Sequence, residues 1–290
     1  MFLLHRCCVF NRMYNSQTQA CIVHAFRQCE SSDSLLQAFK PKPYRSTMAK
    51  RTISSNAAAL NEDGNTRLKR VSIEGNIAVG KSTFSRLLRQ TCQDWAVVSE
   101  PVSEWQNIDN GTSKETGASP QKTTFACMSR FKTQLQPPPT CLLSSPGTPV
   151  QVYERSVYSD RYIFALNMYE LGCINSTEWA VYQDYHSFLV EQFGHQVELE
   201  GIIYLKAPPE KCMERLKRRG RPEEKTVQLD YLYKLHEQHQ RWLVDRSTEI
   251  HFDTLKKIPV LELDASVEFQ TDPAVQENYM TQVRDFFQAL

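Results

Sequence analysis

The sequence predicts an α/β fold for residues 69–290, with a five-stranded parallel sheet flanked by helices on both faces. The first supporting observation is that short apolar runs, little interrupted by charge, alternate with stretches of helical periodicity. Such runs are typical of parallel strands that helices cover on both sides. The second is a glycine-rich turn at the point where the first apolar run passes into the first helical stretch.

Five strands are expected from the apolar runs at 70–74, 95–99, 150–153, 201–205 and 258–263. Helices are expected at 82–91, 175–193, 209–219 and 229–244, where the sequence pattern is helical. Asn175 is a suitable N-cap, and Glu178 three residues later completes a variant of the capping box. This alternation of strands and helices predicts one doubly wound domain over residues 69–290.

Residues 1–68 differ from the rest of the chain, because polar side chains are frequent and no apolar period is sustained. We expect a flexible N-terminal extension there. Residues 1–47 carry six Lys or Arg against two acidic residues, which is the composition of a mitochondrial presequence. Alternatively, Met48 is the working start of a shorter protein of the cytosol or nucleus. Both interpretations stay open.

The overall composition argues against two classes of partner. The 34 basic residues nearly balance the 33 acidic ones, so the surplus that nucleic-acid binding needs is missing. No uncharged apolar run approaches the ~18 to 20 residues that cross a bilayer, so no membrane partner is expected. The nine cysteines are irregularly spaced, which indicates reduced thiols rather than a disulfide framework.

The glycine-rich turn matches the pattern G-x-x-x-x-G-K-S, the P-loop. In such a loop, backbone N–H groups and the start of the following helix bind phosphate oxygens. Lys81 is placed to reach the β- and γ-phosphates, and the Ser82 hydroxyl to bind Mg²⁺. The motif therefore predicts ATP, or another nucleoside triphosphate such as UTP, as a ligand of Gly75, Asn76, Ile77, Ala78, Val79, Gly80, Lys81, Ser82 and Thr83.

Charged side chains follow two other strands where each ends. Glu100 precedes Pro101, and a carboxylate at that edge of the sheet can act as a general base. Glu154 is placed to join the Mg²⁺ shell, and Arg155 to contact the phosphoryl group or to orient Glu100. The structural alternatives are a solvated strand-end Glu and a salt bridge.

A cluster of basic residues lies at the end of the helix predicted at 209–219. It includes Arg215, Arg219 and Arg221 and would repel itself without an anion to bind. A mobile, Arg-rich lid that closes on ATP fits this pattern, because phosphoryl transfer depends mainly on positioning and on neutralising charge. The alternative is a solvated basic face.

Together these motifs resemble the deoxyribonucleoside kinase family, with its deoxycytidine and deoxyguanosine kinases. The similarity runs from about Lys69 to the C-terminus, and the run Glu154–Phe164 (ERSVYSDRYIF) is close to diagnostic. The resemblance implies a P-loop kinase fold and a homodimer. It also implies transfer of the γ-phosphoryl group of ATP to the 5′-hydroxyl of a deoxyribonucleoside, in nucleotide salvage.

The resemblance also implies roles for individual residues. Glu100 would be the base, beside Arg155, and Glu224 would bind the sugar 3′-hydroxyl. Arg130 and Asp160 would be the polar pair that reads the base. Ile77, Trp105 and Phe164 would wall the base pocket, and the loop that follows Asp264 would hold the base of the donor.

One segment departs from the family pattern. The connection from Trp105 to the helix that contains Arg130 is shorter by roughly twenty residues, ~30 Å of helix. It reads as a polar loop at Asn110–Pro120. An active, deoxycytidine-like kinase is therefore weighed against a subunit with a truncated pocket that binds nucleotide and dimerises with little activity. A nucleotide kinase is a third alternative, disfavoured because no further basic cluster is visible for an acceptor phosphate.

Overall fold

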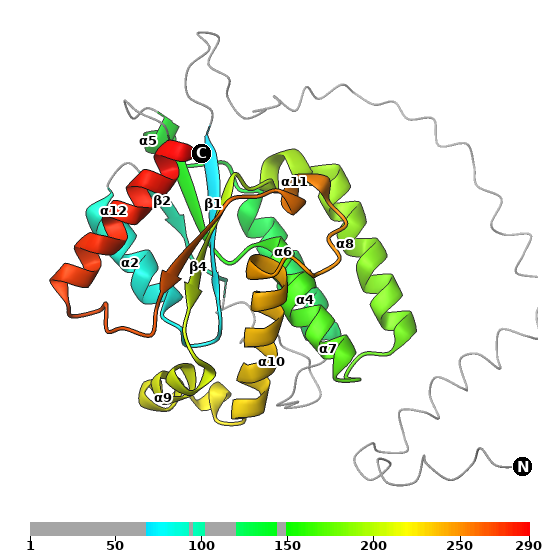
Figure 1. Ribbon diagram of the computed structural model, residues 1–290. Coiled ribbons are helices and arrows are strands. Elements are labelled where there is room, and N and C mark those ends of the chain that lie inside the picture. The colour runs from blue at the N-terminus through cyan, green and yellow to red at the C-terminus, as the bar shows by residue number, and fades with distance from the viewer. Residues whose placement is uncertain (1–67, 93–94, 102–119, 144–148) are drawn as a thin grey trace, which may run out of the picture. The chain divides into compact units, whose positions relative to one another are not determined.

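The computed structural model describes residues 68–92, 95–101, 120–143 and 149–290. Within them lies a five-stranded, all-parallel sheet, shown in Figure 1. The strand order is β2-β3-β1-β4-β5. Its strands are β1 (Lys69–Gly75), β2 (Trp95–Val98), β3 (Val150–Glu154), β4 (Gly201–Lys206) and β5 (Val260–Asp264). After β1, the chain forms β2 and β3 on one side of β1 and then β4 and β5 on the other side. This change of direction in the strand order predicts a ligand crevice beyond the carboxyl end of β1.

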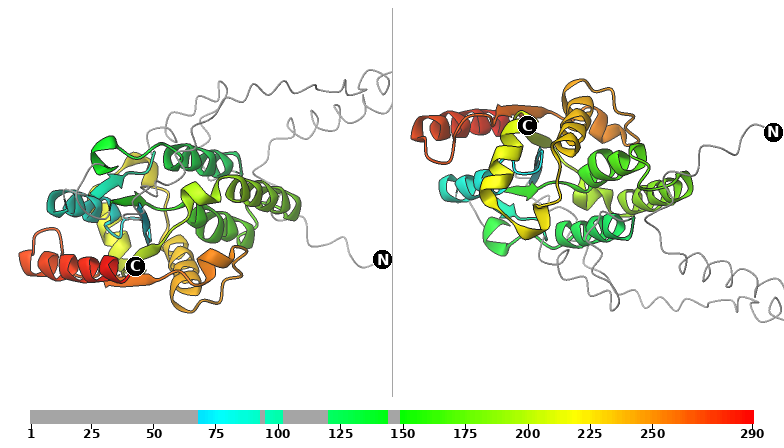
Figure 2. Two further views of the ribbon diagram at one scale, coloured as in Figure 1. Left: turned by 90° about the horizontal axis from the view of Figure 1, so that it is seen from above. Right: turned by 90° about the horizontal axis from the view of Figure 1, so that it is seen from below.

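Successive residues of the central strands face opposite sides of the sheet and enter two separate cores. On one side, Val71 and Ile73 of β1 pack in a core with α2 (Lys81–Thr91) and α12 (Pro273–Ala289). On the other side, Tyr153 of β3 and Tyr204 of β4 pack in a core that includes side chains of the remaining large helices. Figures 1 and 2 show α2 and α12 on one face and α4 and α8 on the other. The predicted α/β sandwich is therefore confirmed.

The second face carries most of the helical residues. Asn175 caps α8 as expected: its side chain accepts from the N–H of Glu178, whose carboxylate accepts from the N–H of Asn175 at 2.8 Å. The large helices of this face are α4 (Pro120–Gln134), α8 (Ser176–Val197) and α10 (Leu229–His239), and α9 (Pro209–Arg219) follows β4. The shorter elements are α5 (Thr140–Leu143), α6 (Val157–Ser159), η1 (Asp160–Ala165), α7 (Leu166–Glu170), η2 (Pro222–Glu224), η3 (Gln240–Val244) and α11 (Asp253–Lys256).

The expected elements differ from the observed ones mainly at their ends. The helix expected at 229–244 consists of α10 followed by η3, a π-helical turn, and the fifth strand begins at Val260 rather than Ile258. Among the helices described, none is both long and apolar enough to cross a membrane. Four cysteines are free thiols: Cys92, Cys127, Cys173 and Cys212. The expectations for the extension, including the presequence at 1–47 and the start at Met48, lie outside the described residues.

Candidate active site

The P-loop connects β1 to α2, and neither of its two glycines can be replaced without strain. Gly75 has φ 145°, and a Cβ there would lie 2.5 Å from the carbonyl oxygen of Leu205. Gly80 has φ 116°, and a Cβ there would lie 2.7 Å from the ring of Phe269. Asn76 fixes the loop against α10, because its side chain donates to the carbonyl of Leu232 at 2.8 Å. The glycines therefore allow a tight loop to lie against β4 and the segment that follows β5.

Lys81 is the first residue of α2 and is almost fully buried. Its Nζ donates to the carbonyl oxygens of Asn76 at 2.8 Å and Gly75 at 3.2 Å, so the side chain is folded back along the loop. Burial and the positive charge of Arg155 lower the pKa of Lys81 to about 7. An anion that enters beside Lys81 would favour its charged form.

Ser82 and Glu154 bring two oxygen ligands together. The Ser82 hydroxyl donates to Oε1 of Glu154 at 2.7 Å, joining the start of α2 to the end of β3. Hydroxyl and carboxylate oxygens suit Mg²⁺, which is usually bound by one or two such groups together with water and substrate phosphates. Across the described residues no group of three or more His, Cys, Asp or Glu is placed to hold a metal by itself. The pair therefore fits a nucleotide-bound Mg²⁺ better than a dedicated metal cage.

Glu100 lies beyond the end of β2 between two arginines. Its Oε1 is 2.9 Å from Arg130 and 3.2 Å from the Nε of Arg155, and 14% of its side chain is exposed. Burial raises the pKa of Glu100, but Arg130, Arg155 and Lys81 outweigh it and lower that pKa overall. The side chain is thus an ionised carboxylate held by cations, and it lines the cavity described below.

Arg130 of α4 links Glu100 to Asp160. Its Nε lies 2.8 Å from Oδ2 of Asp160, and its guanidinium also donates to the carbonyl oxygen of Glu154 at 3.2 Å. The side chains of Arg130 and Asp160 are both buried. Burial raises the pKa of Asp160, and the charge of Arg130 opposes this increase. The two residues expected to read a base therefore form a buried ion pair.

Arg155 has a left-handed backbone, with φ 63°, immediately after β3. Its guanidinium donates to the carbonyl oxygen of Gly75 at 2.8 Å. The same group lies 4.7 Å from the ring centre of Phe164, a cation–π contact. Arg155 thus contacts the start of the P-loop, Glu100 and an aromatic wall of the cavity.

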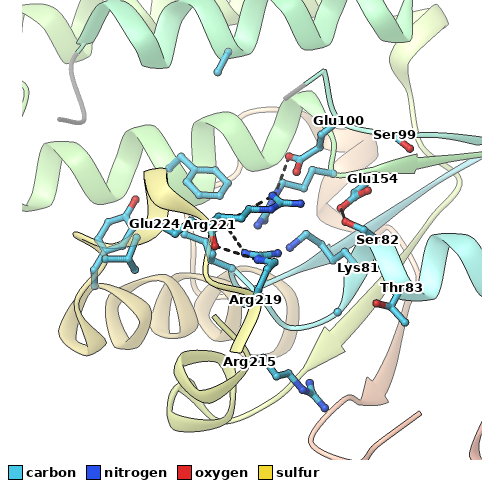
Figure 3. A pocket seen from close by; sticks show the side chains of 18 of the residues that line it. Lys81, Ser82, Thr83, Ser99, Glu100, Glu154, Arg215, Arg219, Arg221 and Glu224 are labelled. Carbon is cyan, nitrogen blue, oxygen red and sulfur yellow. Dashed lines mark hydrogen bonds and ion pairs between the residues drawn. The ribbon is translucent and has the colours of Figure 1, made fainter. Parts of the chain in front are cut away.

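The arginines of the basic cluster have different partners. Arg215 donates to the carbonyl oxygens of Val79, Ala265 and Val267 at 2.6–2.9 Å, so it links the P-loop to the segment after β5. Figure 3 shows it pointing away from Glu100 and Glu154.

Arg219 instead pairs with both carboxylate oxygens of Glu224. Arg221 lies 3.9 Å from the same carboxylate. Figure 3 shows this cluster across the cavity from Ser82 and Glu154.

One cavity of about 810 Å³ connects these groups. It extends from Gly80, Lys81, Ser82 and Thr83 to Glu100, Asp160 and Phe164. The sequence interpretation did not assign several of its lining residues, which are Ala126, Met168, Val227, Tyr231, Phe269 and Gln270. They come from helix faces and two loops, where no local motif distinguishes a lining side chain from a core one.

Two expected residues lie elsewhere. Asp264 lines a second pocket of about 560 Å³ with Lys206 and His236, while the loop that follows it reaches the main cavity through Glu268 and Phe269. Trp105 lies outside the described residues, as does the polar loop before Pro120.

Comparisons with known proteins identify the family of this chain. The model of the deoxynucleoside kinase family matches residues 71–288. The chain is 46% identical over 258 residues to the mitochondrial deoxyguanosine kinase of Xenopus laevis, covering 82% of this chain and 96% of that protein. It is 44% identical over 262 residues to deoxycytidine kinase 2 of Gallus gallus, covering 83% of this chain and 98% of that protein. It is 43% identical over 246 residues to the deoxycytidine kinase of Homo sapiens, covering 78% of this chain and 93% of that protein.

The length of the first alignment also bears on the shortened connection. Its 258 positions exceed the 82% of 290 residues that they cover, about 238, so about twenty positions are gaps in this chain. That size agrees with the connection expected to be shorter by roughly twenty residues. With the family model matching most of its length and relatives above 40% identity, the chain belongs to the deoxynucleoside kinase family.

Proposed function

We propose that this protein transfers the γ-phosphoryl group of ATP, or of another triphosphate such as UTP, to the 5′-hydroxyl of a deoxyribonucleoside, with deoxycytidine as the preferred acceptor. The observation that carries the proposal is the single cavity lined by both the P-loop lysine and the ionised carboxylate of Glu100. A phosphate-binding loop and a general base that share one cavity suit transfer between two substrates bound end to end.

The donor side is assigned to the P-loop. Its backbone N–H groups and the start of α2 would bind the phosphates, with Lys81 neutralising the β- and γ-oxygens. Ser82 and Glu154 would hold Mg²⁺, which when bound neutralises charge on the phosphates. Phe269 and its loop would hold the base of the donor, and Arg215 would fix that loop against the P-loop through the three carbonyl contacts.

The acceptor side is assigned to the residues around Glu100. The carboxylate would take the proton of the 5′-hydroxyl, and Arg155 would keep it oriented. Glu224 would accept a hydrogen bond from the sugar 3′-hydroxyl, which competes with its present pairing to Arg219. Released from Glu224, Arg219 could turn to the transferred phosphoryl group, together with Arg221.

The base is assigned to the Arg130–Asp160 end of the cavity. A carboxylate accepts from an exocyclic amine and a guanidinium donates to ring nitrogen or carbonyl oxygen, which together match the polar edge of cytosine. The named relatives include both deoxycytidine and deoxyguanosine kinases. Turnover assays across the four deoxynucleosides test the preference, and a higher kcat/KM for deoxyguanosine would reverse it.

A second candidate is a nucleotide-binding subunit with little activity. The short connection after Trp105 favours it, because a buried polar edge left unpaired costs ~1–3 kcal/mol of binding and lost walls cost more. ATP binding without turnover of any deoxynucleoside would support this alternative. Phosphorylation of deoxycytidine but not of its monophosphate would favour the nucleoside kinase over a nucleotide kinase.

We also propose a homodimer formed through α8. Val181 and Phe188 lie two turns apart on this helix and are 64% and 57% exposed. Figures 1 and 2 show α8 as the outermost helix on its side of the sheet. Large apolar side chains exposed on one helix face are typical of an interface. Sedimentation should show a dimer for the full chain and a monomer for Phe188→Glu, whereas a monomeric wild type would refute this assignment.

For the compartment, we propose the cytosol with Met48 as the working start, and the mitochondrion if residues 1–47 direct import. Imaging of the full chain and of a chain that starts at Met48 distinguishes the two outcomes.

A further inference from the structure

Glu74 is a fully buried acidic residue to which the proposed reaction gives no role. It lies near the carboxyl end of β1, directly before the first glycine of the P-loop, and none of its surface is exposed. Oε1 of Glu74 accepts a hydrogen bond from the Ser156 hydroxyl at 2.7 Å. No cation of the described residues forms an ion pair with it. Because burying an acid is costly, its place at the edge of the site calls for an explanation.

Three consecutive residues of β1 hold the turn that follows β3. The carbonyl of Ile73 accepts the backbone N–H of Arg155 at 3.0 Å. Glu74 accepts from Ser156, and the carbonyl of Gly75 accepts from the guanidinium of Arg155 at 2.8 Å. Of the three contacts, only the middle one depends on a side chain of β1.

Ser156 is itself fixed as the N-cap of α6. Its hydroxyl oxygen accepts from the N–H of Ser159 at 3.3 Å, and its own N–H donates to the Ser159 hydroxyl at 3.1 Å. The hydroxyl proton of Ser156 therefore remains available to Glu74. Without Glu74, the buried Ser156 hydroxyl would lose the hydrogen bond that it donates, at the start of the helix that leads to Asp160.

The turn needs such support because Arg155 adopts a left-handed backbone, with φ 63°. That conformation is unfavourable for a residue with a side chain and persists only where the surroundings determine it. With this left-handed backbone, the Nε of Arg155 lies 3.2 Å from Oε1 of Glu100. A relaxed turn would move the guanidinium away from the carboxylate.

We propose that Glu74 is a positioning residue for phosphoryl transfer: its hydrogen bond to Ser156 holds the turn that aims Arg155 at Glu100. The inference rests on the proposed function. Burial raises the pKa of Glu74, while the charge of Arg155, the hydroxyls of Ser156 and Ser159 and the charge of Arg130 lower it. Any acceptor oxygen in this place can take the bond, so glutamine should replace Glu74 and leucine should not.

The test compares the full-length wild type with Glu74→Leu, Glu74→Gln and the control Ser72→Ala. Ser72 lies two residues earlier on the same face of β1 and is fully buried, and its hydroxyl has no hydrogen-bond partner among the residues that the structure describes. The arginine Nε–H resonances are recorded by ¹H–¹⁵N NMR, and Arg155→Lys identifies the Arg155 signal by its loss. This readout reports the position of the guanidinium without turnover; kcat and KM with ATP and deoxycytidine are measured in parallel.

Glu74→Leu should shift or lose the Arg155 resonance and lower kcat by about 10- to 100-fold, because a small misplacement of a catalytic group has such effects. Glu74→Gln and Ser72→Ala should keep the resonance and most of kcat. If Glu74→Leu does not fold, Ser156→Ala removes the same bond and should shift the resonance too.

The inference is overturned by an unshifted Arg155 resonance in the leucine variant, or by an equal shift in Ser72→Ala. Loss of kcat without any shift would also overturn it, because the effect would not pass through Arg155. A wild type without turnover would refute the proposed function instead, and the resonances would still decide the role of Glu74.

Discussion

Replacing Glu100 with glutamine separates catalysis from binding. The amide keeps the shape of the side chain and one oxygen that can accept from Arg130 or Arg155. It loses the negative charge and cannot take a proton from a hydroxyl. We therefore expect nucleoside binding to remain and the chemical step to slow.

The size of both effects follows from the contacts of Glu100. A positioned general base contributes about 10²- to 10⁴-fold, or about 2.7–5.5 kcal/mol of barrier. The folded protein should lose only about 1.5–3 kcal/mol of stability, the range for a hydrogen bond to a charged group. Arg130 keeps Asp160 at 2.8 Å, and Arg155 keeps the carbonyl of Gly75. The increase in the activation free energy should thus exceed the loss in the free energy of unfolding, so partial unfolding should not explain the loss in turnover.

The stability loss should also depend on pH. Because the folded protein lowers the pKa of Glu100, its charge stabilises the fold above the unfolded value of about 4.3. That contribution disappears as pH falls through the folded value. The difference in Tm between wild type and Glu100→Gln should therefore be present at pH 7 and should narrow towards acidic pH.

Single-turnover kinetics with saturating ATP measure the chemical step directly, and deoxycytidine titrations give the affinity. Glu262→Gln is a matched control, since Glu262 forms a surface ion pair with Lys206 and does not line the main cavity. The control should keep wild-type kinetics. A Glu100→Gln variant in which only KM changes would refute the role of Glu100 as the base and leave it a binding residue.

Four further predictions concern the donor site, the lid and the short connection. Lys81→Ala should abolish transfer, and turnover above roughly a tenth of wild type would contradict the assignment of this lysine. In the wild type, where the pKa of Lys81 is about 7, ATP binding at pH 7 should be accompanied by uptake of about half a proton, with more uptake at higher pH and less at lower pH. Calorimetry in buffers of different ionisation enthalpy measures the proton uptake, and no uptake at any pH would contradict the prediction. Arg219→Ala should lower kcat without raising KM for the nucleoside, because it frees Glu224; a higher KM with unchanged kcat would oppose the lid role. Inserting a family-length segment after Gly111 should raise kcat/KM for deoxycytidine, and no gain would mean that the segment is not limiting.

The strands and the P-loop could be predicted because their signals are local. The apolar run expected at 70–74 became β1 at Lys69–Gly75, and Asn175 forms the expected cap of α8. The conformations of Gly75 and Gly80 likewise follow from a motif of fixed spacing. In each case the residue type and its neighbours in the chain determine the structure.

What the sequence did not reveal depends on contacts between distant segments. Glu74 faces Ser156 only because β1 lies beside β3, and strand order has no local signal. Arg215 has the same basic side chain as Arg219, yet the carbonyls around it come from the P-loop and the segment after β5. A run of arginines therefore predicts an anion site without showing which of its members face the anion.

The central claim is transfer of a phosphoryl group to the 5′-hydroxyl of a deoxyribonucleoside. The most direct measurement incubates the full chain with ATP, Mg²⁺ and each of the four deoxynucleosides and quantifies ADP and nucleoside monophosphate together. The account predicts equal amounts of ADP and 5′-monophosphate, with the highest kcat/KM for deoxycytidine, and loss of both products in Glu100→Gln. ATP binding with no monophosphate from any deoxynucleoside would contradict it.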